Sequence, residues 1–416
     1  MEIIRKKAEF LNYFFLLLLF FVIPLSKNIT VWVLVFFSIT SFLTADYTAK
    51  FQYNKNNRKN FYILSFSFLY ILYIIGLLYT SNYEYAIFDL KVKFSIFLLP
   101  IVFFLIKESY FSKEFTIKFF QAFLLGVLSN VIICLLIALY KYSYITHSSE
   151  VFYYSSLSYF FHPSYFSMFL NFAIILLLFS SFSNIKILNQ KKNILVVLQL
   201  LFSIFIFLLS SKAGIISLII IYLFYVSIII FSQKRYKLAL LILSSLLLFS
   251  IVFLTIMPSV KDRLKVAFYA LKNKNEAIKS DGESTSDRIL IWETSIDIIK
   301  QNLILGVGTG DVKDELLNKY KENGINFAYQ QKLNAHNQYL QTFISIGLIG
   351  FIVLILSFLL PVIQSIKRQH YIYLMFLFLI AFNILVESMF ENQAGVVFYA
   401  FFNTFLFLSS KQLADN

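Results

Sequence analysis

Residues 238–257 read LALLILSSLLLFSIVFLTIM, an apolar run without a charged side chain. A helix rises about 1.5 Å per residue, so about 20 residues cross the ~30 Å hydrocarbon core of a bilayer. Further apolar runs occupy residues 61–80, 117–140 and 339–363. Helices made from such runs are apolar on all sides, and a water-soluble fold could not bury so many of them. The runs therefore predict an all-α integral membrane protein.

The composition supports the same class. Of the 416 residues, 59% are apolar and 14% are charged, whereas a soluble domain has about 45–50% apolar and about 25% charged residues. The net charge of +14 could indicate nucleic-acid binding, but the positive residues lie in short segments at alternate ends of the apolar runs. That distribution sets the orientation of membrane proteins, so membrane lipids rather than nucleic acid are the predicted surroundings. The one cysteine, Cys134, lies within an apolar run and is expected to be a buried hydrophobe.

About twelve membrane-spanning helices are expected. They are placed at residues 9–25, 29–45, 61–79, 93–107, 117–140, 164–183, 194–210, 214–231, 238–257, 339–361, 371–388 and 394–409. With the N-terminus in the cytoplasm, the cytoplasmic segments carry 19 Lys and Arg residues and the short outer loops carry 5. The five outer residues are Lys27, Lys91, Lys93, Lys141 and Lys212. This excess predicts that both termini are cytoplasmic.

One long loop divides the chain into three parts. Residues 1–257 hold spans one to nine, residues 258–338 form a large outer loop, and residues 339–416 hold the last three spans and a cytoplasmic tail. Loops longer than about 15 residues are usually functional or disordered. Apolar residues at helical spacing predict a helix over residues 286–305 and an amphipathic helix over residues 311–323, whereas the polar residues 273–286 are expected to be mobile.

Four histidines are candidates for chemistry. His336 lies where the large loop re-enters the membrane, in the sequence NAHNQY. A histidine there can take a proton from a hydroxyl, or it can simply cap a helix. His162 directly precedes Pro163 and is either an interfacial cap or a substrate contact. His147 and His370 are expected to be solvated surface residues.

Two cations near the outer face could bind an anion. Arg288 lies in the first turn of the predicted loop helix, where a positive charge opposes the helix dipole. Either a nearby acid or an anionic ligand should compensate, and a guanidinium suits two phosphate oxygens. Lys212, in the sequence SSKAG, is either a phosphate contact or a lysine that reaches out to the interface. Glu387 and Glu391 flank the turn between the last two spans and need cationic partners, for which Arg288 and Lys212 are the candidates.

The glycines and the acidic residues narrow the chemistry further. The sequence GVGTG at residues 306–310 lacks the Lys-Ser/Thr pair of a nucleotide-binding loop, so it is expected to end the preceding helix. Gly347 and Gly350 are expected to allow close helix packing. No cluster of His, Asp and Glu suggests a divalent metal, and neither a metal nor another cofactor is predicted.

These features together resemble the O-antigen ligase and polymerase superfamily of bacterial membrane glycosyltransferases. The resemblance rests on the dozen spans with a large loop before the last three, and on two motifs. The first motif is SDR at residues 286–288, with Trp292, leading to GVGTG. The second is AHNQYL at residues 335–340, followed by Gly347 and Gly350. Residues 200–350 carry most of the likeness.

The resemblance implies a fold, a location and a reaction. It implies a protein of the bacterial cytoplasmic (inner) membrane with its large loop in the periplasm. Such proteins transfer a glycan from an undecaprenyl diphosphate carrier to an acceptor. The acceptor is lipid A–core in ligases, another carrier-linked repeat in polymerases, or a protein hydroxyl in O-oligosaccharyltransferases, and the sequence leaves these three open. The implied reaction inverts the anomeric carbon and needs no metal.

The resemblance also implies roles for individual residues. The family's loop arginine and loop histidine match Arg288 and His336, which are expected to be catalytic. Arg288 would also bind the diphosphate, together with Lys212, which stands where ligases often have an arginine. Lysine keeps the charge of that arginine but lacks its bidentate fork. Possible supporting residues are His162, Glu387 and Asn337.

A transporter or flippase for a lipid-linked or small anionic solute is the alternative. Such proteins also have about twelve spans, but they place charges and broken helices at the middle of the membrane. In this chain the spans hold almost no charges, and the polar residues of interest gather at the outer face. That distribution favours chemistry at the membrane surface over a translocation path.

Overall fold

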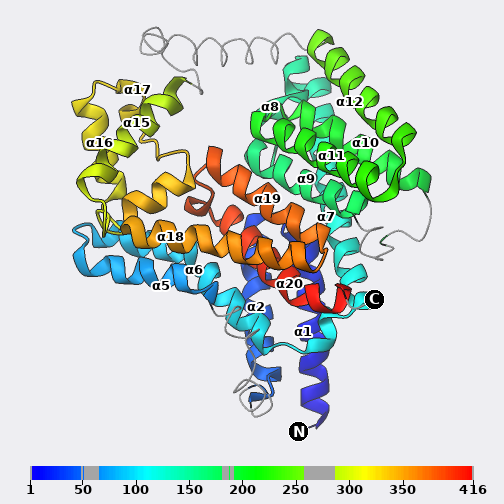
Figure 1. The fold of residues 1–416 in the computed structure, drawn as a ribbon, viewed down its shortest axis with the longest axis horizontal. Helices are drawn as coiled ribbons and strands as arrows, with labels where there is room; N and C mark the ends of the chain where they lie inside the picture. The colour runs from blue at the N-terminus through cyan, green and yellow to red at the C-terminus, as the bar shows by residue number, and fades with distance from the viewer. Residues whose placement is uncertain are drawn as a thin grey trace.

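The computed structural model describes residues 2–47, 50, 65–179, 187, 192–256 and 286–414 (Figure 1). Within these residues the chain forms helices and short helical turns and no strand. The all-α prediction is confirmed for this part of the chain. Each predicted apolar segment overlaps a helix, but the number that cross the membrane stays a prediction.

The helices before the large loop lie in the first 256 residues. They are α1 (Glu2–Val22), α2 (Lys27–Thr44), α5 (Phe68–Ile75), α6 (Tyr83–Leu105), α7 (Lys113–Lys141), α8 (Tyr154–Leu157), α9 (Pro163–Phe179), α10 (Lys192–Leu208), α11 (Lys212–Gln233) and α12 (Tyr236–Ile256). The loop and the C-terminal part hold α15 (Ser286–Gln301), α16 (Val312–Glu322), α17 (Asn326–Gln330), α18 (Gln338–Lys367), α19 (Tyr371–Val386), the short turn η6 (Met389–Glu391) and α20 (Gln393–Ala414).

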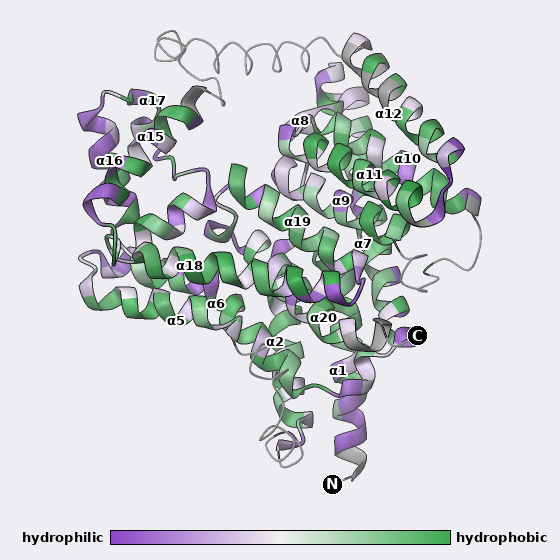
Figure 2. Cartoon of the chain, in the orientation of Figure 1, coloured by the Kyte–Doolittle hydropathy of each residue, from purple (hydrophilic) through white to green (hydrophobic). Residues whose placement is uncertain are grey.

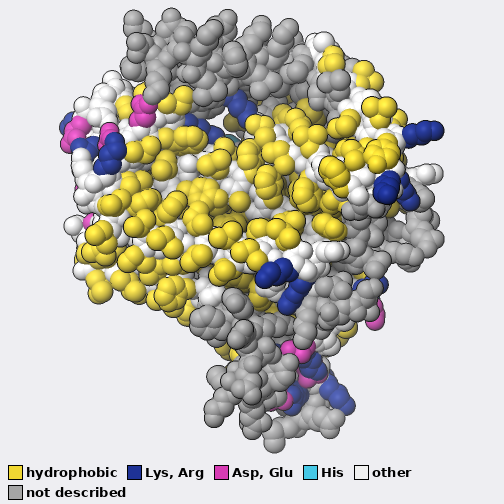
Figure 3. Space-filling model, in the orientation of Figure 1, with side chains coloured by type: hydrophobic (Ala, Val, Ile, Leu, Met, Phe, Trp, Pro, Cys, Tyr) yellow, Lys and Arg dark blue, Asp and Glu magenta, His cyan; other side chains and the backbone are white. Residues whose placement is uncertain are grey.

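Among the described residues, five helical segments are long and apolar enough to cross a membrane: Lys27–Thr44, Lys113–Thr146, Lys212–Phe231, Gln338–Lys367 and Gln393–Ser410. Five further apolar helices are shorter. Figure 2 shows that these helices are apolar over most of their length, whereas α16 and α17 of the large loop are more polar. Figure 3 shows a broad apolar surface over α18 and its neighbours, with Lys and Arg mostly at its margins. The chain is therefore a multi-pass membrane protein.

Packed aromatic rings join the helices at the centre of the molecule. Phe402 of α20 contacts Phe20 of α1 at 5.4 Å and Phe172 of α9 at 4.7 Å between ring centroids. Phe402 also meets Phe123 of α7 at 5.1 Å and Phe376 of α19 at 6.0 Å. Edge-to-face aromatic pairs of this kind stabilise a core beyond the area that they bury. These contacts fix α20 among four other helices, and they thereby fix the position of the turn η6 that precedes it.

The large loop has a small core of its own. Ile291 and Ile298 of α15 pack with Leu316 and Tyr320 of α16, and Ile344 of α18 joins the same cluster. The prediction that this part of the loop is ordered is confirmed for residues 286–338. The predicted helix over 286–305 was too long, because α15 ends at Gln301. Residues 258–285, which include most of the segment predicted to be mobile, lie outside the described residues.

A kink in α18 holds the glycine segment of the loop. At Gly347, φ is +65° and the helical hydrogen bonding is interrupted. The exposed backbone groups bond to the loop instead: Leu348 N–H donates to Leu303 O at 3.0 Å, and Val307 N–H donates to Ile344 O at 2.8 Å. A Cβ on Gly347 would lie 2.1 Å from Ile304 O. Broken helices at membrane depth need such substitute partners.

The GVGTG segment is therefore a docking element, and the prediction that it ends a helix is wrong. A Cβ on Gly306 would meet the α18 backbone at 2.5 Å, and one on Gly310 would lie 2.0 Å from Asn82 O. Thr309 Oγ1 donates to Tyr73 O at 2.7 Å. The glycines let the loop backbone lie directly against α18 on one side and the α5–α6 connection on the other. Gly347 likewise accommodates this loop segment rather than a second helix.

Candidate active site

The candidate site is a cavity of about 580 Å³ where the large loop meets the ends of several helices. Its wall includes His162, Lys212, Arg288, His336 and Glu387. These are five of the six residues singled out from the sequence, and they come from segments up to 225 positions apart. The structure brings them together around one space.

Five helices begin at or near this cavity, namely α9, α11, α15, α18 and α20. The residues from these helix starts that line it are His162 and Ser164, Ser211 and Lys212, Arg288, His336, and Asn392. The first backbone N–H groups of a helix have no partner within the helix, and the helix dipole adds a partial positive charge there. Helix N-termini are consequently good places for anions. The backbone and two cationic side chains favour an anionic ligand in the same space.

Glu387 joins the two residues expected to be catalytic. Its Oε2 lies 3.6 Å from Arg288 Nη2, and its Oε1 lies 3.4 Å from His336 Nδ1. The three side chains are partly exposed to the cavity, at 31% for Arg288, 24% for His336 and 21% for Glu387. Arg288, one of the two cationic partners expected for Glu387, thus contacts it. The same contact supplies the negative charge that Arg288 needs in the first turn of α15.

The charge of Glu387 sets the chemistry of its neighbour. Burial acts to raise the pKa of the Glu387 carboxyl, but the contacts with His336 and Arg288 outweigh burial and hold the pKa below its ordinary value. An ionised carboxylate next to Nδ1 favours the tautomer with the proton on that nitrogen. In that tautomer the free lone pair of the imidazole is on Nε2. Carboxylate and imidazole have this relation in enzymes that use histidine as a base.

The backbone around the cavity is unusual. His336 has a φ of +44°, Ser210 a φ of +49° and Tyr154 a φ of +50°. All three line the cavity, and they are three of the seven non-glycine residues with positive φ in the described part of the chain. A left-handed conformation is costly for a residue with a Cβ, and it persists where the surroundings impose it. Such conformations cluster at functional sites.

Lys212 is the first residue of α11 and reaches the cavity from the membrane helices. Its neighbour Ser211 caps the helix by accepting a hydrogen bond from Gly214 N–H at 3.2 Å. Asn171 of α9 donates to Gly214 O at 2.9 Å. These bonds fix the start of α11, so the position of Lys212 is set by the scaffold.

The remaining predicted residues divide into two kinds. His162 lines the cavity and its Nδ1 also accepts from Ser164 N–H at 3.3 Å, so it both caps α9 and reaches the site. Asn337 is buried and is not among the lining residues. Its side chain accepts from the first N–H groups of α18, and its own N–H donates to Ser388 Oγ at 3.1 Å. Asn337 therefore holds the segment that carries His336.

The two other histidines lie away from the cavity. His147 is exposed, as predicted. His370 is buried and accepts from Tyr373 N–H at 3.1 Å as the cap of α19, so the prediction that it is solvated was wrong. Desolvation lowers the pKa of His370 to about 4.

Comparison with known families places the central part of this site. Residues 197–355 match the model of a family described as O-antigen ligase. This stretch, which is less than half of the chain, resembles an O-antigen ligase domain. The match includes Lys212, Arg288 and His336 and confirms the resemblance drawn from the sequence. It supports membrane glycosyl transfer of the O-antigen ligase and polymerase type. No match to a curated protein was found.

Helix α6 and the turn η6, both outside the ligase domain, form an ionic cluster that was not predicted from the sequence. Lys93 was expected in an outer loop, but it lies within α6 and is 1% exposed. Its Nζ atom lies 2.7 Å from Glu391 Oε1 and also contacts Asp89. Glu391 lines the cavity and pairs with Lys93, a partner that was not among the two expected from the sequence. The four-residue spacing of Asp89 and Lys93 on one helix was the one available signal in the sequence.

Proposed function

We propose that this protein transfers a glycan from an undecaprenyl diphosphate carrier to an acceptor hydroxyl at the periplasmic face of the bacterial inner membrane. The observation that carries the proposal is the cavity in which Arg288, Lys212 and the Glu387–His336 pair converge. An anion-binding wall and a base within one cavity suit a reaction whose leaving group is a diphosphate. The ligase domain supports the reaction class.

The cations act on the leaving group. As the bond from the anomeric carbon to the phosphate oxygen breaks, negative charge grows on the diphosphate. Arg288, Lys212 and the helix N-termini are already directed toward that charge, and preorganised charges of this kind stabilise a transition state more than the ground state. Arg288 can exchange its long 3.6 Å contact with Glu387 for a bidentate contact with phosphate oxygens.

The histidine acts on the acceptor. Nε2 of His336 takes the proton of the acceptor hydroxyl while its oxygen forms the new bond to the anomeric carbon. Glu387 stabilises the imidazolium that results. The acceptor attacks from the side opposite the diphosphate, so the configuration of the anomeric carbon inverts. The charge on the leaving group is carried by side chains and helix ends, and the reaction proceeds without a metal.

The membrane location follows from the donor. The polyprenyl chain of the carrier stays among the apolar helices, and the large loop covers the headgroup over the cavity. His162 lies at the same wall and is placed to contact the substrate. The acceptor is the hydroxyl of lipid A–core, of a growing glycan or of a protein.

The test replaces Arg288 and His336 separately by alanine in the native host. Matched controls are Lys300→Ala, an exposed cation on the same helix α15, and His147→Ala, an exposed histidine away from the cavity. We expect both site variants to abolish the surface glycan at wild-type protein abundance, and both controls to keep it. Blotting of membranes checks abundance, and a polysaccharide gel checks the glycan.

The form of the defect identifies the acceptor class. Core without chains, with finished polymer still on the carrier, indicates a ligase. Core with a single repeat indicates a polymerase. An unchanged core profile with loss of glycoprotein indicates transfer to protein. An unchanged glycan in both site variants overturns the catalytic assignment.

A further inference from the structure

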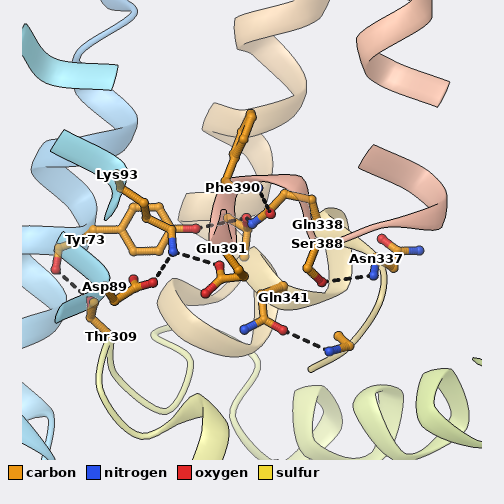
Figure 4. Close-up of polar contacts among 12 residues, drawn as sticks. Tyr73, Asp89, Lys93, Thr309, Asn337, Gln338, Gln341, Ser388, Phe390 and Glu391 are labelled. Atoms are coloured by element: carbon orange, nitrogen blue, oxygen red, sulfur yellow. Dashed lines mark hydrogen bonds and ion pairs between the residues drawn. The ribbon is translucent and has the colours of Figure 1, made fainter. Parts of the chain in front are cut away.

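A buried ionic cluster lies directly behind the wall of the cavity (Figure 4). Lys93 of α6 binds Glu391 with a distance of 2.7 Å between Nζ and Oε1, and it also binds Asp89 one turn earlier on its own helix. The ring of Tyr73 lies 4.9 Å from the same ammonium group. Glu391 belongs both to this cluster and to the cavity wall. A helix of the first hundred residues is thus linked by charge to the candidate site.

The turn at residues 387–391 connects this cluster to the catalytic pair. Glu387 at its beginning contacts His336 and Arg288, and Glu391 at its end contacts Lys93. Two hydrogen bonds hold the turn against the start of α18. Asn337 N–H donates to Ser388 Oγ at 3.1 Å, and Phe390 N–H donates to Gln338 Oε1 at 2.7 Å. These bonds hold the turn that carries Glu387 against the segment that carries His336.

The hydrogen bonds of Tyr73, the other residue close to the Lys93 ammonium group, lead to α18 and not to the turn. Tyr73 Oη lies 3.0 Å from Thr342 Oγ1, which fixes α5 to α18. Gln338 Nε2 donates to the same threonine at 3.2 Å. Of the residues on α6 and α5 in this cluster, Lys93 is the one with an ion pair to the turn. A charge buried at this depth is costly, and well-packed apolar residues often stabilise a fold equally well. A buried ion pair is therefore better explained by the specific geometry that it imposes.

We propose that Lys93 is a positioning residue, which holds the 387–391 turn through Glu391 so that Glu387 meets both His336 and Arg288. The inference rests on the proposed function of these three residues. Catalytic groups must be held to within about half an ångström of their productive positions, and groups one contact removed commonly change activity by about 10–100-fold. The first half of the chain, outside the ligase domain, then contributes directly to the geometry of the site.

The chain offers a matched pair of variants to test this. Glu391→Gln and Asp89→Asn each remove one carboxylate charge from the cluster, and each leaves Lys93 with one charged partner. The two changes alter the net charge equally. They differ in which partner remains: Asp89 on α6 in the first variant, or Glu391 on the turn in the second.

The measurement is steady-state glycan transfer by purified full-length protein, with lipid-linked glycan extracted from the host as donor, and with activity expressed per folded monodisperse protein. We expect Glu391→Gln to lower kcat about tenfold or more with an unchanged donor KM. We expect Asp89→Asn to keep kcat per folded protein close to the wild-type value, because the Lys93–Glu391 pair that reaches the turn remains. His336→Ala serves as the inactive reference.

Three outcomes count against the inference. Equal kcat in the two variants and the wild type means that the cluster has a structural role only. A raised KM in Glu391→Gln means that Glu391 touches the donor itself. An equal loss of kcat in both variants means that the net charge rather than the link to the turn matters. Retained activity in His336→Ala is a separate result, which overturns the proposed function instead.

Discussion

The two carboxylates at the ends of the 387–391 turn lie in contrasting surroundings. Glu387 faces the cavity, is 21% exposed, and meets its two partners at 3.4 and 3.6 Å. Glu391 contacts Lys93 at 2.7 Å, and that lysine is 1% exposed and also binds Asp89. The first cluster is loose and open to the cavity, whereas the second is tight and closed around the buried Lys93, with Glu391 as its member on the cavity wall.

The difference distinguishes charged residues that take part in the reaction from charged residues that fix the structure. In the open cluster, long contacts leave Arg288 able to turn to a diphosphate and His336 able to take a proton. In the closed cluster, Lys93 is already bound to two carboxylates, so it has little capacity for a substrate. A charged residue at a membrane protein's outer face is a candidate for chemistry when its own partners are distant and a cavity adjoins it.

The largest expected effect is on the free energy of unfolding, which should fall more when the buried lysine is replaced than when the partly exposed arginine is replaced. Lys93→Met removes the counter-ion of the buried Asp89 and of the partly buried Glu391. Loss of one partner of a buried pair costs about 3–5 kcal/mol. Arg288→Met removes a partly exposed contact worth about 0–1 kcal/mol. We expect the thermal unfolding midpoint in detergent to fall clearly in Lys93→Met and to stay near wild type in Arg288→Met. Equal midpoints would show that the buried cluster carries no more stability than the open one.

The next effect is on activity and concerns Glu387. Glu387→Gln keeps the shape of the side chain but removes the charge that orients His336 and stabilises its protonated form. Loss of such a supporting carboxylate costs about 10–100-fold in rate. The glycan-transfer rate should fall by this amount while the unfolding midpoint stays unchanged. The opposite pattern, an unchanged rate with a lowered midpoint, would assign Glu387 to the structural cluster.

The helices and part of the open cluster could be predicted from the sequence. The helices follow from apolar runs, because hydrophobicity over about 20 residues is a local property. Arg288 and His336 could be found because charged and titratable residues are rare at the membrane surface of this chain. For Glu387 the sequence offered Arg288 and Lys212 as candidate partners, and the structure shows a contact with Arg288.

The closed cluster could not be predicted in the same way. Lys93 and Glu391 are 298 positions apart in the sequence. The residues around each of them do not indicate that α6 packs beside the turn before α20. The start of α6 was placed ten residues too late, because its first turns carry Glu84, Asp89 and Lys91 and so do not look like a membrane helix. The role of the GVGTG segment was hidden for a similar reason. Its glycines pack against the kinked backbone of α18, and a kink of this kind depends on tertiary contacts.

The smallest expected effect concerns Lys212, whose position in the family is often occupied by arginine. Lys212 contributes charge at the start of α11, in addition to the helix N-terminus itself. Lys212→Met should lower the glycan-transfer rate about tenfold, since one charge-assisted contact is worth about 1.5 kcal/mol. Lys212→Arg should stay within a few-fold of wild type, because the charge is kept and a guanidinium can still meet phosphate oxygens.

The pair of Lys212 variants measures whether this cation acts on the reaction or only anchors α11 at the interface. An anchoring lysine would be replaced by arginine without change and by methionine with a lower unfolding midpoint, while the rate per folded protein stayed constant. A cation that stabilises the leaving diphosphate shows the reverse: the rate falls in Lys212→Met at a constant midpoint. Ser211 and Asn171 hold the start of α11 through Gly214, and neither substitution removes these bonds, so a fall in rate at a constant midpoint reports on the charge.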